Sequence, residues 1–347
     1  MNSKLNISKI TLFSMFVVVG IFAAIIGYFF RQSLKQHETL KHELRLIVYA
    51  PKSFISPFGP GQEIKRNFEK KCGCAVDYVD MGGAETAVDK MKLDPQRRVD
   101  VVLGADLLDL QHIVNSVSVQ EVVLPEMKFR KAIQPMVFPR FVPYDWSPMG
   151  FVYRRGEVKP YKSLAAFLKN APADSLALED PGLSSAGLEW LYWIFRTQTN
   201  VRTALKSLRR VTETVAPTWS TAYGLFENGQ VKIAFSYLTS LVYHWQVQKD
   251  RHYQFMPFQE GQPVQIEYAF VPNSCWDCST AKDFVRDLLT VQNQKILAEK
   301  NFMYPVIAGV PLSGAFHELP KVKVLGRKDI ERFAHKQNEL IHTWQNF

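Results

Sequence analysis

The chain has 347 residues, which predicts two domains or lobes, because a single domain usually contains about 100–200 residues. Its content of 47% hydrophobic and 22% charged residues is typical of a folded protein and excludes intrinsic disorder. The 42 Lys and Arg residues outnumber the 33 Asp and Glu residues, for a net charge of +9, but they form no basic tail, so we expect no nucleic-acid partner.

Residues 10–30 form an uncharged apolar run that is long enough to cross a membrane. The run exceeds the apolar core of a cleaved signal peptide, and it ends in Gly27-Tyr28-Phe29-Phe30 rather than in a small-residue cleavage site. We therefore predict a cytoplasmic leader at 1–9, a signal anchor or transmembrane helix at 10–30 and a linker at 31–43. A buried core helix is the alternative, although nothing upstream could cover it. The rest of the chain is then an exported body.

The first part of this body alternates predicted strands and helices. Residues 44–50, 75–80 and 99–104 are short and β-rich, as strands are, and the stretches between them, 62–71 and 84–93, carry apolar residues at helical spacing. This order predicts βαβ units and a parallel sheet with both faces covered.

The alternation returns after residues 138–153, which are rich in Pro and aromatic residues and which we interpret as a connecting segment. Further strands are predicted at 175–178 and 231–237, and helices at 188–195, 220–228, 281–293 and 329–345. Gly229 closes the helix at 220–228, because glycine best tolerates the left-handed conformation past a helix end. Two α/β lobes of this kind place a ligand cleft between them.

The four cysteines form two local pairs, Cys72-Gly73-Cys74 and Cys275-Trp276-Asp277-Cys278. They are disulfide candidates in an exported protein, and we prefer structural disulfides to thiol chemistry. The spacing matches a zinc site poorly, so we expect no metal.

The sequence gives little support for catalysis. The histidines are scattered, and motifs such as HExxH, GxSxG, the P-loop and GxGxxG are missing. Asp100 and Asp106 form a carboxylate pair, but such residues near strand ends are usually solvated or capping. We therefore expect no enzyme activity and no cofactor.

Aromatic residues at the ends of predicted elements point to a ligand instead. Trp219 lies just before a helix start, Tyr237 ends a strand and Tyr243 follows it; their ring faces attract cations and stack on planar heterocycles. Ser184, Ser185 and Gly187 open the helix at 188–195, where free N–H groups favour an anion. The alternatives are ordinary core aromatics and an ordinary serine N-cap. A cationic heterocycle with a hydroxyl or phosphate suits both features.

The chain resembles the periplasmic thiamine-binding proteins of ABC-type importers in a series of short motifs, which occur in the same order from about residue 44 to residue 344. These motifs are Ile47-Val48-Tyr49, Ser53-Phe54, Gly59-Pro60-Gly61, Cys72-Gly73-Cys74, Asp100-Val101-Val102-Leu103-Gly104, Phe141-Val142-Pro143-Tyr144-Asp145, Asp180-Pro181, Trp219-Ser220, Ala222-Tyr223-Gly224-Leu225-Phe226, Ser236-Tyr237, Thr239-Ser240, Tyr243-His244, and Asn301 followed by Met303-Tyr304-Pro305-Val306.

The resemblance implies a two-lobed type II periplasmic-binding-protein fold, with lobe 1 at 44–142 and 263–318 and lobe 2 at 143–262 and 319–347. It implies a monomeric solute-binding protein on the periplasmic side of the inner membrane, either tethered or, if the anchor is cleaved, secreted. This protein would deliver thiamine or its phosphates to an ABC-type permease. Trp219, Tyr237 and Tyr243 would surround the ligand, and residues 184–187 would lie near its hydroxyl or phosphate end.

The chain departs from the family pattern at three places. Pro51 replaces a tyrosine, Gly83 replaces an acidic ligand residue, and Tyr144-Asp145-Trp146-Ser147 replaces a Tyr-Asp-Tyr-Gly sequence. Asp80, Glu85 or Asp145 would supply the missing carboxylate beside a bound cation.

These departures keep other functions open. One alternative is another solute, namely a different cationic heterocycle, a polyamine or ferric iron, although a Tyr-Tyr pair for iron is lacking. The other is an exported thiamine-degrading enzyme with a cysteine nucleophile, which the local pairing of all four cysteines disfavours.

Overall fold

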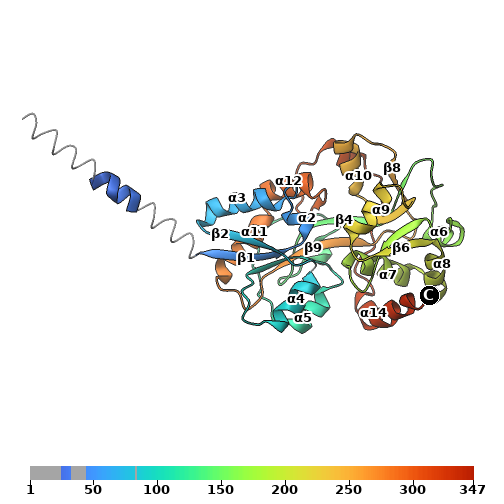
Figure 1. Ribbon diagram of the computed structural model, residues 1–347, viewed down its shortest axis with the longest axis horizontal. Helices are drawn as coiled ribbons and strands as arrows, with labels where there is room; N and C mark the ends of the chain where they lie inside the picture. Colours follow the sequence, from blue (N-terminus) through green and yellow to red (C-terminus); the bar gives the residue numbers. More distant parts are fainter. Residues whose placement is uncertain (1–24, 33–43, 83) are drawn as a thin grey trace, which may run out of the picture.

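The computed structural model describes residues 25–32, 44–82 and 84–347 (Figure 1). Within these ranges no helix has the length and apolarity needed to span a bilayer. Residues 10–24 of the predicted transmembrane helix and Gly83 lie outside the described ranges, so the structure does not support the predicted anchor. The remaining part of that prediction, residues 25–30, belongs to a short helical segment at 25–32 whose side chains are exposed.

One continuous sheet runs through the body, with strand order β2-β1-β3-β9-β4-β7-β5-β6 and with β8 and β10 paired to β4. The strands are β1 (Arg45–Ala50), β2 (Ala75–Asp80), β3 (Val101–Ala105), β4 (Val142–Arg154), β5 (Leu176–Glu179), β6 (Thr212–Ala216), β7 (Ile233–Tyr237), β8 (Tyr253–Phe255), β9 (Val264–Phe270) and β10 (Tyr304–Pro305). The pairs β1–β2, β1–β3, β5–β6 and β5–β7 are parallel, whereas β9 and β4 run antiparallel to their neighbours. The predicted parallel sheet is therefore mixed at its centre.

The strand β4 joins two segments of the sheet. Residues 142–148 pair with β9 in the first sheet segment, and residues 149–153 pair with β7 in the second. This buried strand occupies most of residues 138–153, which we interpreted as a connecting segment. The region does connect the two sheet segments, but it does so as a strand of the sheet. The strand was not predicted because the sequence contains Pro143 and Pro148 there, and proline is rare inside a sheet.

Helices cover both faces of each sheet segment (Figure 1). Those of the first segment are α2 (Lys52–Ile55), α3 (Gly61–Cys72), α4 (Ala84–Leu93), α5 (Leu110–Ser116), α11 (Cys278–Leu288) and α12 (Val291–Lys300). Those of the second segment are α6 (Leu164–Asn170), α7 (Ser185–Thr197), α8 (Val201–Val211), α9 (Trp219–Glu227), α10 (Ser240–Tyr243), α13 (Gly314–Glu318) and α14 (Ile330–Gln345). Short helical turns, η1 (Gln134–Met136) and the π-helix η2 (His244–Gln248), complete the elements.

The buried side chains form separate cores on the two sides of β4. One core takes its residues from 46–146 and 264–310, and a second mainly from 149–258 and 325–344. A third core lies under α9 and includes Ala315 and Phe316 of α13. The strand β4 links these cores, because residues 142–146 belong to the first and residues 149–153 to the other two.

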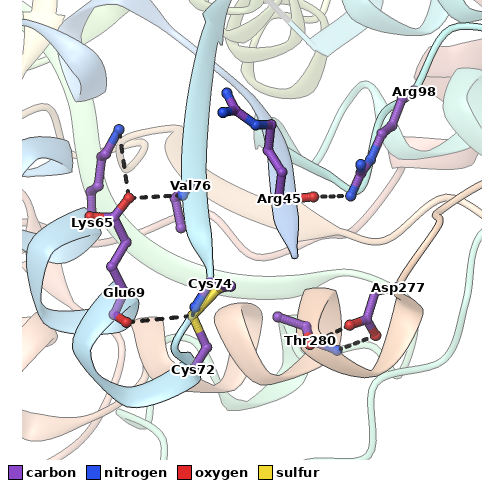
Figure 2. The surroundings of a disulfide bond; sticks show 9 residues. All are labelled: Arg45, Lys65, Glu69, Cys72, Cys74, Val76, Arg98, Asp277 and Thr280. Carbon is purple, nitrogen blue, oxygen red and sulfur yellow. Dashed lines mark hydrogen bonds and ion pairs between the residues drawn. A yellow bond between two sulfur atoms is a disulfide. The ribbon is translucent and has the colours of Figure 1, made fainter. Parts of the chain in front are cut away.

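Both cysteine pairs form disulfides in the structure, Cys72–Cys74 and Cys275–Cys278, each with its Cα atoms 5.2 Å apart. Figure 2 shows the first disulfide at the turn from α3 to β2, where Gly73 has the left-handed φ of 65° that glycine tolerates. Glu69 closes this turn by accepting a hydrogen bond from the Val76 amide at 2.9 Å. The second disulfide lies at the start of α11.

Candidate functional site

A pocket of about 300 Å³ lies where the two sheet segments meet. The second segment contributes side chains from α9, β7 and α10, and the first contributes Ser53 of α2, Glu267 of β9 and the chain after α12. The lining residues are Ser53, Trp219, Tyr223, Glu227, Tyr237, Thr239, Ser240, Tyr243, Glu267, Asn301, Phe302 and Met303.

Aromatic rings form one wall of this pocket. Trp219 stacks on Tyr223 with ring centroids 5.0 Å apart and planes 19° from parallel, and Tyr237 lies 5.4 Å from Trp219 at a steeper angle. The indole Nε1 of Trp219 donates to Ser236 Oγ at 3.0 Å, which fixes the orientation of the ring. Tyr243, also in the pocket lining, packs edge-on against Phe302, with ring centroids 5.4 Å apart. The structure therefore brings together the three aromatic residues that the sequence singled out.

The start of α9 places Trp219 at the pocket. Thr218 caps the helix by accepting a hydrogen bond from the Thr221 amide at 3.2 Å, so the next residue is the first of the helix. Gly229, with a φ of 76°, follows the helix end as predicted. Tyr223 follows Trp219 by four residues in α9. The two side chains therefore lie beside each other on one face of the helix.

The buried side chain of His244 forms a hydrogen bond with the hydroxyl of Tyr223. The hydroxyl of Tyr223 is 2.7 Å from Nε2 of His244, and Nδ1 of that ring is 2.6 Å from Gln248 Oε1. Burial lowers the pKa of His244, so the ring is neutral near pH 7. The neutral His244 ring donates its Nδ1–H to the amide oxygen of Gln248. Its Nε2 therefore accepts a hydrogen bond from the hydroxyl of Tyr223.

The pocket lining also contains an acidic residue from the first sheet segment, Glu267 of β9. Glu267 is 9% exposed and accepts a hydrogen bond from Tyr144 Oη at 2.7 Å. Asp145 lies fully buried behind the pocket lining and accepts from Asn301 Nδ2 at 2.8 Å. Burial raises the pKa of Asp145 well above its usual range, and the charge of Glu267 raises it further. Burial likewise raises the pKa of Glu267.

Two more buried carboxyl groups act on Tyr237. Burial raises the pKa of the Tyr237 hydroxyl well above 10, and four carboxylates add to this effect: Glu267, Glu179, Asp106 and Asp145. Burial raises the pKa of Glu179 to about 8 and that of Asp106 to about 6. Ionising these groups inside the protein is costly unless a positive charge is close. The pocket surroundings therefore favour a cation.

The other predicted site residues do not line the pocket. Ser185 at the start of α7 donates its hydroxyl to Asp109 Oδ2 at 3.2 Å, and Ser184 makes no side-chain capping bond. Gly187 is buried against the backbone of Asp180. Asp80 is exposed at the end of β2 and accepts from the Gly82 amide at 3.0 Å.

Sequence reasoning missed several pocket residues. Glu227, Glu267 and Asn301 were not singled out as ligand contacts, although Asn301 begins the matched stretch from Asn301 to Val306. Glu267 faces the pocket from β9, a strand that was not predicted. Among the described residues, no group of His, Cys, Asp and Glu side chains could hold a metal ion.

Comparison with known proteins gives a consistent result. A family model described as bacterial extracellular solute-binding protein matches residues 46–303. A thiamine-binding periplasmic protein of Brucella melitensis biotype 1 is 32% identical over 80% of this chain and 84% of its own length. A protein of the same name from Salmonella typhimurium is 28% identical over 86% of this chain and 92% of its own.

Solved structures agree on the fold. A periplasmic thiamin binding protein aligns with a TM-score of 0.80 and 27% identity, over 87% of this chain and 95% of its own. A ferric binding protein from Campylobacter jejuni aligns with a TM-score of 0.71 over 87% of this chain and 98% of its own, but at 16% identity it shows the fold alone.

Proposed function

Because the chain belongs to the family of bacterial extracellular solute-binding proteins, we propose that it is the thiamine-binding component of an ABC-type importer. It binds thiamine or a thiamine phosphate in the pocket between the two sheet segments and delivers it to a membrane permease. It acts by binding and without chemical change to the ligand.

One observation carries the choice of ligand: stacked aromatic rings and the buried carboxyl group of Glu267 line the same pocket of about 300 Å³. Thiamine has a flat aminopyrimidine and a permanently charged thiazolium ring. The ring faces of Trp219, Tyr237 and Tyr243 offer stacking and cation–π contacts, worth roughly 0.5–2 kcal/mol each. A bound cation favours the ionised form of Glu267, which has Asp145 behind it and takes the place of the acidic residue missing at Gly83.

We assign two lobes around this pocket, one comprising 44–142 and 263–318 and the other 143–262 and 319–347. The separate cores at 46–146 with 264–310 and at 149–258 with 325–344 support this division. In this arrangement α2, β9 and the chain after α12 approach the ligand from one lobe, and α9, β7 and α10 from the other.

The protein works as a monomer in the periplasm, where its named relatives function. The apolar run at 10–30 supports a tether to the inner membrane. Fractionation of cells that express the full chain tests the tether: the protein should sediment with membranes and resist extraction by high salt. Release of a shortened chain into the periplasmic fraction would instead mean that the segment is cleaved.

Calorimetric titration of the purified full-length chain with thiamine tests the function. We expect binding in the micromolar range or tighter, accompanied by a change in tryptophan fluorescence. A protein that binds none of thiamine, its monophosphate or its diphosphate would overturn the proposed ligand. Intact thiamine recovered after long incubation would support binding without catalysis, and cleavage products would contradict it.

A further inference from the structure

Two acidic side chains lie directly opposite each other in the sheet beside the pocket. Asp145 of β4 pairs with Glu267 of β9 in the antiparallel ladder, and side chains at such opposite positions are close neighbours on one face of a sheet. Glu267 lines the pocket and is 9% exposed, whereas Asp145 is fully buried. The two carboxyl groups therefore share a site that water scarcely reaches, and one of them borders the space that a ligand fills.

The hydrogen bonds around this pair satisfy one negative charge better than two. Tyr144 Oη donates to Glu267 at 2.7 Å, and Asn301 Nδ2 donates to Asp145 Oδ2 at 2.8 Å. Asp145 Oδ1 is buried and has no hydrogen-bond partner among the described residues. Two buried carboxyl groups that share a site do not both ionise readily, because like charges repel strongly where water is excluded.

The pocket lining brings no positive charge to the pair. None of its described residues is Lys or Arg, and Glu227 of α9 is its other acid. Its remaining titratable groups are tyrosine hydroxyls, and burial raises the pKa of two of these, Tyr223 and Tyr237. The lining therefore lacks a side-chain cation, and a ligand can supply one.

The elements packed around the pair do not supply a cation either. Lys52 of α2 and Lys295 and Lys300 of α12 are exposed, and the last two are ion-paired with Glu299 and Glu63 at 3.6 and 2.9 Å. On β10 the charge of Arg130 acts on Tyr304. The end of β3 and α7 bring two more acids, which are hydrogen-bonded to each other: Asp106 and Glu189.

From this cross-strand pair we infer that Asp145 and Glu267 hold one proton between them before the ligand binds and release it to the solvent when a cation enters the pocket. The inference rests on the proposed function and states how its site recognises the thiazolium ring. The positive charge of the ring replaces the proton as the partner of the second carboxylate. The pair is thus the specificity determinant that favours a charged ring over a neutral one, and binding tightens as the pH rises.

Calorimetric titration of the full-length chain with thiamine, in two buffers that differ in ionisation enthalpy, counts the protons released. We expect at least about half a proton per thiamine near neutral pH. The dissociation constant should fall at least about threefold per unit rise in pH, out of about tenfold for one full proton. Thiamine binding without proton release would overturn the inference and leave the proposed function intact. Failure to bind thiamine at all would overturn both.

An uncharged thiamine analogue, in which carbon replaces the thiazolium nitrogen, tests the role of the pair in selection. This analogue keeps the shape and the stacking faces of thiamine but not its charge. It should bind at least about tenfold more weakly than thiamine and release no proton, because nothing replaces the proton on the pair. Equal affinity for the two compounds, or equal proton release, would overturn the inference.

Asp145→Asn identifies the groups that hold the proton. This variant keeps an acceptor oxygen for Asn301 and leaves Glu267 to ionise without a like charge opposite, so proton release should fall to less than about half of the native value. Glu213→Gln, an exposed change on β6, is the matched control and should keep the native release. Loss of the release in Glu227→Gln rather than in Asp145→Asn would overturn the assignment. The proton count and the analogue use the native chain, so they test the inference even if Asp145→Asn does not fold.

Discussion

Trp219 is the residue on which the aromatic wall depends, because it contacts both Tyr223 and Tyr237 and is oriented by Ser236. Trp219→Ala should weaken thiamine binding at least about tenfold, since it removes a stacking face and a cation–π partner. Calorimetry measures the loss, and circular dichroism verifies that the fold is kept.

Trp219→Phe is the matched control for this substitution. It retains a ring next to Tyr223 but loses the hydrogen bond to Ser236, so its affinity should fall between those of the native chain and of the alanine variant. An alanine variant with native affinity would show that the ligand does not lie against this wall.

Glu179 makes protein stability depend on pH. Its carboxyl oxygens are buried and have no hydrogen-bond partner among the described residues, and burial raises its pKa from 4.5 to about 8. When a carboxyl group has a higher pKa in the folded protein than in the unfolded chain, its contribution to stability is complete at pH values below the pKa of the unfolded chain. This contribution is lost as the pH rises through the pKa of the folded protein. The free energy of unfolding should therefore fall between pH 4.5 and pH 8, by up to about 1.4 kcal/mol per pH unit.

Urea denaturation of the ligand-free protein across this range measures the effect. Glu179→Gln has no charge to gain and should flatten the pH dependence, whereas Glu213→Gln, on the surface, should not. A slope that survives in Glu179→Gln would assign the effect to other buried groups, such as Asp106.

At the residue scale, sequence reasoning was limited by distance along the chain. Trp219, Tyr237 and Tyr243 lie within 25 residues of one another, on elements whose ends could be predicted, and they meet in the pocket. Glu267 and Asn301 reach the pocket from β9 and from the end of α12, and no local pattern relates them to the aromatic residues. Their place in the pocket depends on tertiary packing, and no local pattern in a single sequence shows which distant residues this packing brings together.

At the scale of elements, the start of α7 allows a test of why glycine stands at position 187. A Cβ atom there would meet backbone atoms of Asp180 and Pro181 at 2.5–2.7 Å, and backbone cannot move aside cheaply. Gly187→Ala should therefore destabilise the protein, by about 1–3 kcal/mol as expected for overpacking.

Gly224→Ala in α9 provides the comparison, because a Cβ atom at that position meets nothing within 4 Å. It should be neutral or stabilising, since alanine is the better helix former. Urea unfolding of both variants distinguishes the two cases. A Gly187→Ala protein as stable as the native chain would mean that the helix start can shift to make room.

The sequence predicted some strands of the sheet and missed others, whatever their place in it: the edge strand β6 was missed, whereas β7, the neighbour of β4, was expected at 231–237. The strands β1, β2 and β3 and the helices α3 and α4 were expected close to their observed bounds, because short β-rich runs alternate there with helical periodicity. The strands β4 and β9 were missed, since each is buried on both faces and shows no alternation of polar and apolar residues.

At the scale of the whole molecule, the pocket joins two parts that have separate cores. A ligand that touches Ser53 and Glu267 on one side and Trp219 and Tyr243 on the other should draw these parts together. Thiamine should therefore lower the radius of gyration measured by small-angle X-ray scattering, and it should raise the melting temperature through preferential binding to the folded state.

Trp219→Ala again supplies the control, since it should lose both responses at a thiamine concentration that saturates the native chain. A rise in melting temperature without a change in radius of gyration would mean that the protein binds thiamine without closing. Neither response in the native chain would argue against a ligand between the two parts.

The position of β9 determines when the protein can fold during its synthesis. This strand, at Val264–Phe270, lies between β3 and β4, which are made far earlier. Until β9 emerges from the ribosome, β3 and β4 lack the neighbour that joins them, and the first core lacks its residues from 264–310. Such late, non-local pairing slows folding. For a periplasmic protein we expect this delay to help export, because a chain that still lacks β9 cannot complete its first core.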